Sequence, residues 1–540
     1  MSESDGAGLR GDLLTGATSR RRFFAGAGAL ALAGGAVVVP VGRNVDDASA
    51  ASVAADGSFS AVRVGPSDPR YHTLSMGFNQ RWVGRPAYIQ VVGSTGQVVD
   101  AVREAVRDRL RITVRGGGHC YEDFVSGNRG GVIIDLSQMH GVSRSSDGTF
   151  WLQGGCTNWD VYTELYKRFD VTLPGGSCYS VGLGGHVAGG GYGLLSRQFG
   201  LTVDYLSAVE VVVVNSDRSV SVVTARWDDR RTRDLVWGHT GGGGGNFGVI
   251  TRYGFARLPR PPQEVWLSTV AWDWDSITPA RFRALLENYG RFMAANSRPG
   301  SPYSRLFSLL KLTHRSAGQI VLLTQVSGSD ESLLQSFLAQ ISRGVGGPIA
   351  QTRAVGAEQT ITPSVANRRM PWLQATQTLN GSGPNQRGKY KSAYMIAPFP
   401  PEQIVAVYAA LTDPKYDNPQ ALLQVDSYGC QVNARSPTAT AVAQRSSIMK
   451  LQYQTYWTDP ADDDVNLAWI RRFYRSVYAS TGGAPIPNRV TDGCYVNYPD
   501  VDLRHWARLY YKQNYRRLQH VKAQWDPTNT FHYSQSIRLP

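Results

Sequence analysis

Apolar residues recur with two different periods in the first half of the chain. Residues 88–92 and 111–116 are short β-branched runs that predict strands, and residues 96–109 carry apolar positions at helical spacing. The same patterns predict strands over 131–139, 150–154 and 247–255, a helix over 158–169 and a β-hairpin over 201–224. This half is therefore expected to be a mixed α and β domain.

The pattern changes after the proline-rich segment 259–262, where three apolar runs alternate with three amphipathic stretches. Strands are expected over 265–272, 319–328 and 421–430, and helices over 280–293, 331–341 and 401–411. An antiparallel sheet with helices on one face is the simplest arrangement that buries both patterns. The sequence thus predicts a second domain over residues 259–486.

Length and composition agree with a soluble enzyme of two domains. The chain has 540 residues, more than a single hydrophobic core usually organises. Its formal net charge is +14, but the basic residues are spread along the chain and no basic-aromatic motif accompanies them. We therefore do not expect nucleic-acid binding.

The N-terminal segment has the pattern of a twin-arginine export signal. Residues 19–24 are SRRRFF, and the Ala/Gly-rich apolar stretch 25–39 is too short to span a bilayer. A cleavage site is expected near 48–50, so residues 1–50 are interpreted as a signal peptide and 51–65 as a linker. The protein is therefore expected to be secreted in the folded state, without a membrane span.

Two glycine-rich segments carry the candidate chemistry. They are VRGGGHC (114–120) and GGSCYSVGLGGHVAGGGYG (175–193), which together hold twelve glycines, His119 and Cys178. Glycine at this density marks places where the backbone approaches a ligand closely or takes a positive φ. The second segment does not fit the dinucleotide fingerprint, which needs GxGxxG after a strand and an acidic residue about 20 positions on. The segments are interpreted as a cofactor groove.

The remaining cysteines add no second site. The five cysteines of the chain stand at positions 120, 156, 178, 430 and 494. They are too few and too scattered for a disulfide framework, and none forms the CxxC pair of a metal site. No metal is expected.

With His119 and Cys178 in this order, the chain resembles the berberine-bridge-enzyme-like FAD-linked oxidases. In that family a His bonds the 8α-methyl carbon of the flavin and a Cys bonds its carbon 6. Three later segments carry the same resemblance. Residues 234–256 resemble a second flavin-contacting segment, residues 495–503 resemble the NYxDxDL motif, and residues 525–537 resemble the closing signature of the family. The resemblance implies FAD held by two covalent bonds, one to each residue.

The resemblance also implies the domain organisation. It gives an α+β fold with a two-part FAD-binding domain of the vanillyl-alcohol-oxidase type, formed by residues 66–258 and 487–540. The substrate domain, an antiparallel sheet over 259–486, would be inserted between the two parts and would lie over the flavin.

Individual site residues follow from the same resemblance. Tyr498 is expected to be the catalytic base, and Tyr428 to lower its pKa or give a second proton route, since a phenol with a pKa of about 10 is a poor base unaided. Tyr192 and Gln424 are expected to contact the substrate. Besides His119 and Cys178, the residues expected to bind FAD are Arg115, Gly116, Gly117, Gly118, Val181, Gly182, Gly185, His186, Gly190, Gly248, Val249 and Asn497.

The resemblance implies oxidation of a secondary alcohol, with the deoxysugar of a glycosylated polyketide as the expected substrate, as in antibiotic biosynthesis. Val181 stands three residues after Cys178, where members of the family carry the residue that gates oxygen access to the flavin; a small residue there implies molecular oxygen as acceptor and hydrogen peroxide as product. Cys430 and Asn433-Ala434 supply no acid, which argues against the ring-closing chemistry of plant relatives. An oligosaccharide oxidase that forms a lactone and a natural-product binding protein without activity stay open as alternatives, as does the oligomeric state.

Overall fold

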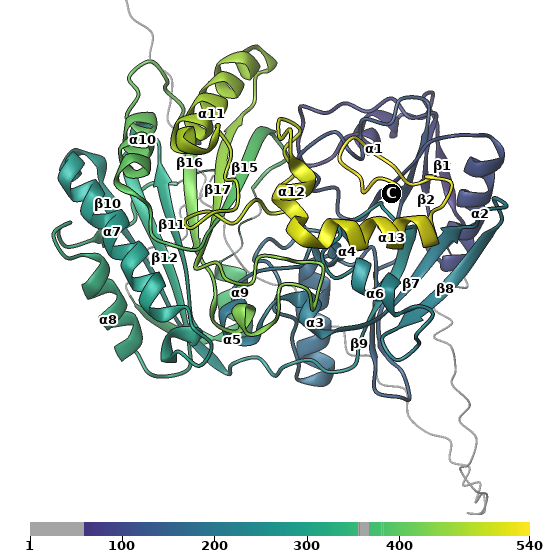
Figure 1. Cartoon of the computed structure of the whole chain (residues 1–540), viewed down its shortest axis with the longest axis horizontal. Helices are drawn as coiled ribbons and strands as arrows, with labels where there is room; N and C mark the ends of the chain where they lie inside the picture. The colour runs from purple at the N-terminus through teal and green to yellow at the C-terminus, as the bar shows by residue number, and fades with distance from the viewer. Residues whose placement is uncertain (1–58, 355, 357–366, 380, 382) are drawn as a thin grey trace, which may run out of the picture. The chain divides into compact units, whose positions relative to one another are not determined.

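The computed structural model describes residues 59–354, 356, 367–379, 381 and 383–540. The predicted signal peptide and residues 51–58 of the predicted linker lie outside these residues. The described residues form three β-sheets with helices against them (Figure 1).

The first sheet contains the three strands that the sequence predicts and a fourth that it does not, because Val62–Val64 of the predicted linker 51–65 pairs antiparallel with residues 89–91. It has the strand order β1-β2-β4-β3, with β1 Val62–Val64, β2 Tyr88–Val91, β3 Ile112–Arg115 and β4 Val132–Asp135. Helix α2 (Thr95–Arg107) connects β2 to β3 and begins where the Ser94 hydroxyl accepts from the Gln97 amide. The strand predicted over 131–139 ends early, because the Asp135 carboxylate accepts from the Ser137 amide and starts a turn.

The second sheet is antiparallel, with the order β5-β6-β9-β7-β8. Its strands are β5 Val142–Arg144, β6 Phe150–Gln153, β7 Leu206–Val214, β8 Val220–Arg226 and β9 Val249–Phe255. The predicted hairpin begins later than expected, at Leu206, because the Asp204 carboxylate accepts from the Leu201 amide and closes a short 3-10 turn. Apolar side chains of α2 pack with both sheets in one buried cluster.

The third sheet has eight antiparallel strands in the order β13-β10-β12-β11-β16-β17-β15, with β14 paired to β10. The strands are β10 Glu264–Asp273, β11 Leu306–Thr313, β12 Gln319–Ser327, β13 Ile349–Ala350, β14 Arg368–Pro371, β15 Arg387–Met395, β16 Leu422–Ser427 and β17 Met449–Trp457. Three of these, β10, β12 and β16, confirm the predicted strands. Sequence reasoning missed β11, β13 and β14, and also β15 and β17. In β15 two lysines occupy alternate positions, and in β17 one lysine and two glutamines do, although these side chains are buried.

The five predicted helices are confirmed as α2, α3, α7, α8 and α10, whereas α11, α12 and α13 were not predicted. Helices α7, α8, α10 and α11 gather on one face of the eight-stranded sheet (Figure 1). The helices other than α2 are α1 Tyr71–Ser75, α3 Asn158–Phe169, α4 Leu183–Ala188, α5 Ser196–Phe199, α6 Arg233–Gly238, α7 Pro279–Asn296, α8 Ser332–Ile341, α9 Trp372–Thr378, α10 Pro401–Leu411, α11 Asp463–Val477, α12 Trp506–Tyr511 and α13 Tyr515–Trp525. Among the described residues, no helix is long and apolar enough to cross a membrane.

The C-terminal segment returns to the N-terminal sheets, as the interleaved organisation requires. Helix α13 packs against α6, and its Lys522 side chain is fully buried. The Lys522 Nζ atom lies 2.6 Å from an Asp526 carboxylate oxygen and donates to the carbonyls of Asn246 (2.8 Å) and Phe531 (2.6 Å). One buried ammonium thus ties the closing signature to the glycine-rich loop before β9. The domain limits 259 and 486 stay predictions.

Replacing Lys522 by Met is expected to lower the free energy of unfolding by about 3–5 kcal/mol, because Asp526 would be left buried without its partner. Denaturant unfolding followed by circular dichroism measures this loss. Arg516→Met, at an exposed position of the same helix, is the control and should change the free energy by less than about 0.5 kcal/mol. Equal losses in both variants would show that the buried Lys522–Asp526 pair contributes no more to the free energy of unfolding than an exposed side chain does.

Candidate functional site

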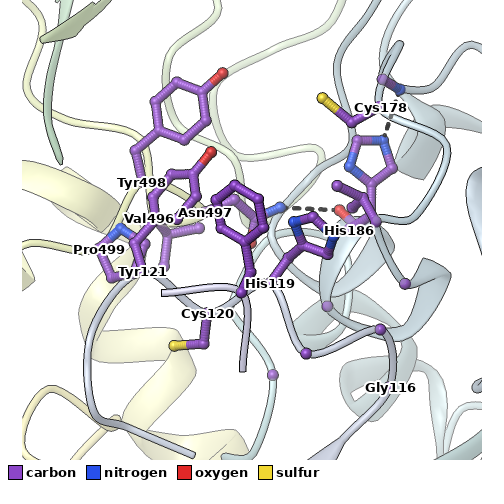
Figure 2. A pocket seen from close by; sticks show the side chains of 18 of the residues that line it. Gly116, His119, Cys120, Tyr121, Cys178, His186, Val496, Asn497, Tyr498 and Pro499 are labelled. Carbon is purple, nitrogen blue, oxygen red and sulfur yellow. Dashed lines mark hydrogen bonds between the residues drawn. The ribbon is translucent and has the colours of Figure 1, made fainter. Parts of the chain in front are cut away.

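A cavity of about 390 Å³ lies between the glycine-rich segments and the eight-stranded sheet. Its walls come from the loop after β3, the segment around α4, the loop before β9, strands β11, β16 and β17, and residues 495–499. Figure 2 shows part of this wall, with His119, Cys178, His186 and Tyr498 around the same space. Its volume is in the range of small-molecule and cofactor sites.

Two glycines bring the glycine-rich segments into direct backbone contact. A Cβ atom built on Gly117 would lie 2.3 Å from the Gly182 nitrogen, and one built on Gly182 would lie 2.1 Å from the Gly117 nitrogen. Gly248, with φ of +148°, would place a Cβ 2.5 Å from the Val212 carbonyl oxygen. Because side chains are excluded at these positions, the cavity has a cradle of bare backbone on this side. Such a cradle fits the predicted FAD site.

His119 and Cys178 both line this cavity. The His119 Nε2 atom lies 2.9 Å from the Ser180 hydroxyl, and its ring stacks on Phe78 with 4.6 Å between centroids. Burial lowers the pKa of His119 to about 4, so its imidazole is neutral near pH 7. A neutral ring nitrogen and a thiol beside the cradle are the two groups that the predicted flavin bonds need.

His186 and Asn497 connect the cradle to the C-terminal segment. The His186 Nε2 atom accepts from the Gly176 amide at 3.0 Å, and burial lowers the pKa of His186 to about 4. Asn497 donates from Nδ2 to the His186 carbonyl at 3.0 Å (Figure 2) and packs on Gly189, where a Cβ would lie 2.0 Å from Oδ1. Both side chains line the cavity, and their hydrogen bonds connect the segments that form its wall.

Two predicted FAD-binding residues, Gly190 and Val249, have other environments. Gly190 lies away from the cavity, where a Cβ would meet the Val442 side chain at 2.8 Å. Val249 is buried in the core with α2, since strand alternation turns its neighbour Ile250 to the cavity instead. Arg115 lines the cavity, but its guanidinium pairs with the Asp135 carboxylate at 2.5 Å. Besides His119, Cys178, His186 and Asn497, the predicted residues that line the cavity are Arg115, Gly116, Gly117, Gly118, Val181, Gly182, Gly185 and Gly248.

Tyr498 shares a buried ammonium with an acidic residue. The Lys450 Nζ atom donates to the Tyr498 hydroxyl at 2.8 Å and lies 2.8 Å from an Asp426 carboxylate oxygen. Burial raises the pKa of Tyr498 well above its usual value, with the Asp426 charge as a further cause, while burial lowers the pKa of Lys450. The cation also lies over the rings of Tyr498 (4.3 Å), Tyr192 (4.6 Å) and Tyr495 (5.1 Å).

The predicted partner of Tyr498, Tyr428, lies elsewhere. Its side chain is fully buried outside the cavity wall and donates to the Gln444 carbonyl at 3.3 Å. Tyr428 follows the end of β16, whose alternating residues Leu422, Gln424 and Asp426 face the cavity. The structure therefore places Lys450, not Tyr428, beside the Tyr498 hydroxyl. Tyr192 lines the cavity as predicted, but its hydroxyl donates to the Ser427 carbonyl.

The eight-stranded sheet gives the cavity a polar wall that sequence reasoning mostly missed. Gln424 pairs with Gln452 and Asp426 pairs with Lys450 across β16 and β17, so all four side chains share one face. Gln424 was predicted; it donates to Asp426 at 2.8 Å. The Gln452 amide donates to the Tyr121 hydroxyl at 3.2 Å. The missed signal is the alternation of polar residues in β17, KLQYQ, which places a polar side chain at every second position.

Comparisons with known proteins agree with this site. A family model for an FAD-binding domain matches residues 86–218, and one described as berberine and berberine like matches residues 494–538. The aclacinomycin-N/aclacinomycin-A oxidase of Streptomyces galilaeus is 41% identical over 97% of this chain and 98% of its own length. The hexose oxidase of Chondrus crispus is 38% identical over 87% of this chain and 93% of its own.

Solved structures give the same answer for the fold. A glycopeptide hexose oxidase in complex with teicoplanin superposes with a TM-score of 0.83 at 41% identity, over 89% of this chain and 99% of that chain. The predicted α+β fold with an FAD-binding domain of the vanillyl-alcohol-oxidase type is confirmed, and the protein is an FAD-linked oxidoreductase. The chain belongs to the berberine-bridge-enzyme-like family of FAD-linked oxidases.

Proposed function

We propose that this protein oxidises a secondary alcohol on a sugar, which is free or attached to an aromatic natural product. The electrons are passed to molecular oxygen, which is reduced to hydrogen peroxide. The observation that carries the proposal is the contact of Tyr498 with Lys450 beside the glycine cradle. An alcohol that loses a hydride must also lose its hydroxyl proton, so a base within hydrogen-bond reach is required. Bound FAD would supply the hydride acceptor and the reactivity with oxygen.

Tyr498 takes the hydroxyl proton in this proposal. Burial opposes the phenolate form that can accept a proton, since it raises the pKa of Tyr498. The Lys450 ammonium acts in the other direction, because its hydrogen bond at 2.8 Å stabilises the phenolate. Asp426 holds the ammonium in place and balances its charge. The three residues together set how easily Tyr498 gives up its proton to become the base.

The polar wall supports a hydroxylated substrate. Gln424, Gln452 and Gln454 line the cavity, and amide groups both donate to and accept from sugar hydroxyls. Tyr121 and Phe307 add apolar surface on which a ring can pack. The relatives are named for aclacinomycin, hexose and glycopeptide substrates. The deoxysugar of a glycosylated polyketide is the proposed substrate, and a free oligosaccharide is the second candidate, favoured by the glutamine-rich wall.

Oxygen use and export complete the proposal. Val181 lines the cavity three residues after Cys178, and its small side chain would leave room for oxygen. Residues 19–24 carry the twin-arginine pattern for export of the folded protein with its flavin in place.

Two covalent bonds to FAD are expected, one from each cradle segment. Acid-precipitated protein should stay yellow, and its intact mass should exceed the mass of the chain by one FAD. His119→Ala and Cys178→Ala should each keep the flavin through the remaining bond, and the double variant should release it on denaturation. Release of flavin from the unaltered protein would refute the double linkage.

Peroxide release should distinguish the substrates. A coupled peroxidase assay is expected to respond to glycosylated aromatic polyketides, and a response to simple oligosaccharides alone would favour the second candidate. Tyr498→Phe should lower kcat by about 10²–10⁴-fold with the flavin still bound, since it removes the base. Absence of peroxide with every alcohol tested would favour a binding protein without activity.

Lys450→Met is expected to move the acid limb of the kcat/KM profile to higher pH by about one unit or more. Turnover needs the Tyr498 phenolate, so the rate rises as pH passes through the pKa of Tyr498. Removing the ammonium leaves the effect of burial unopposed and raises that pKa further. Lys415→Met, at an exposed position, is the control and should leave the profile in place. A Lys450→Met profile that overlays the unaltered one would contradict the role of the cation.

A further inference from the structure

Strand β15 forms one edge of the eight-stranded sheet, and segments from outside the sheet cover it. Asn79 exchanges two hydrogen bonds with the backbone of Gly388, at 3.0 and 3.1 Å. At the other end of the strand, the Tyr394 amide donates to the Gly493 carbonyl at 2.8 Å, and the Asp492 amide donates to the Tyr394 carbonyl at 2.8 Å. The FAD-binding part of the chain therefore meets the substrate sheet along this edge.

The two faces of β15 have different partners. Tyr390 pairs with Gln454 and Tyr394 pairs with Lys450 across β17, so these side chains belong to the cavity face. Lys389 and Lys391 alternate with them and therefore belong to the opposite face, where α11 packs. Their side chains are 1% and 4% exposed. Two ammonium groups are thus buried behind the cavity wall.

Three carboxylates meet these lysines. The Lys389 Nζ atom bonds to Glu122 and lies 2.8 Å from an Asp500 oxygen. The Lys391 Nζ atom lies 2.7 Å from the other Asp500 oxygen and 2.9 Å from Asp502. Arg471 of α11 closes the group with a contact of 2.9 Å to Asp502. We call this cluster the clasp; its members are Glu122, Lys389, Lys391, Arg471, Asp500 and Asp502.

The carboxylates of the clasp are close in sequence to the tyrosines of the cavity. Glu122 follows Tyr121, and Asp500 stands two residues after Tyr498. Tyr121 stacks on Tyr390 of β15 with 3.6 Å between ring centroids, and its ring lies 5.8 Å from that of Tyr498. The segment that carries Tyr498 therefore passes around the edge of β15, with the phenol on the cavity side and the carboxylates on the helix side.

Stability alone is a poor explanation for such a cluster. Removing ions from water costs free energy that a buried pair hardly recovers, and well-packed apolar residues often stabilise a site as well. Directional charge pairs, in contrast, fix one register between segments that apolar surfaces would allow to slide. The clasp balances three positive and three negative charges and uses both oxygens of Asp500. Its geometry suits a positioning role.

We propose that the clasp positions Tyr498 against Lys450 and Tyr121 against Gln452, with Glu122, Lys389 and Asp500 as positioning residues. Lys450 and Gln452 are fixed by β17, which pairs with β15 along nine residues. Tyr498 lies in a loop, which Asn497 ties to the FAD-binding part and Asp500 ties to β15. The proposal rests on the proposed function, in which Tyr498 is the base.

The test removes one charge of each sign, in the double variant Lys389→Met/Glu122→Gln, so that the remaining clasp stays neutral. Arg471→Met is a milder variant, because this side chain is 42% exposed. The control is Arg387→Met on the same strand; Arg387 pairs with Asp463 of α11 and touches neither tyrosine. Thermal unfolding of each flavin-loaded variant reports any general loss of stability.

The position of Tyr498 can be read directly by fluorine NMR of flavin-loaded protein that carries Tyr498→3-fluorotyrosine. Lys450→Met in the labelled protein gives the resonance without the ammonium. Breaking the clasp should move the resonance toward that reference, with a smaller shift in the same direction for Arg471→Met, and should lower kcat roughly tenfold to a hundredfold. Arg387→Met should leave both unchanged.

A resonance that stays in place in the double variant and in Arg471→Met, whatever the melting temperature, would overturn the proposal. If the double variant does not fold, the Arg471→Met comparison decides alone. The resonance needs no turnover, so an unaltered protein that oxidises no alcohol would refute the proposed function while the reading of the clasp stands.

Discussion

The site depends on the contacts of the Lys450 ammonium, because they join strand β17 of the eight-stranded sheet to the loop that carries Tyr498. The charge of Lys450 is buried, so it needs the Asp426 carboxylate at 2.8 Å to remain in the fold. The same charge contacts the Tyr498 hydroxyl, whose ionised form burial opposes. The fold that satisfies the charge of this one lysine therefore also places it beside the hydroxyl of the proposed base, Tyr498.

The opposite wall of the cavity follows a different constraint, which is steric. Gly117 and Gly182 touch through their backbones, and any side chain at either position would separate the two segments. This contact brings His119 and Cys178, which are far apart in sequence, to one cavity. Absence of side chains thus shapes the cofactor side, and buried charge shapes the substrate side.

The site requires many polar and charged side chains to be buried inside the protein. Charged and polar side chains of β15, β16 and β17 are buried on both faces of the sheet, where an ordinary sheet would carry apolar residues. The lysines among them are each bonded to two or more polar partners. The alignment of the tyrosines with the sheet is therefore specified by hydrogen bonds and charges as well as by packing.

The sequence by itself determined most strands of the N-terminal sheets, three helices of the second half (α7, α8 and α10) and the cradle motifs around His119 and Cys178. These rest on local signals: hydrophobic period, glycine density and motif order. It missed the strand β11 and the helix α11, and it missed β15 and β17, whose buried lysines and glutamines are residue types typical of exposed positions. It also chose Tyr428 instead of Lys450 as the neighbour of Tyr498. Only the tertiary structure decided these, because strand register across β16 and β17, and not distance along the chain, sets which side chains share the cavity face.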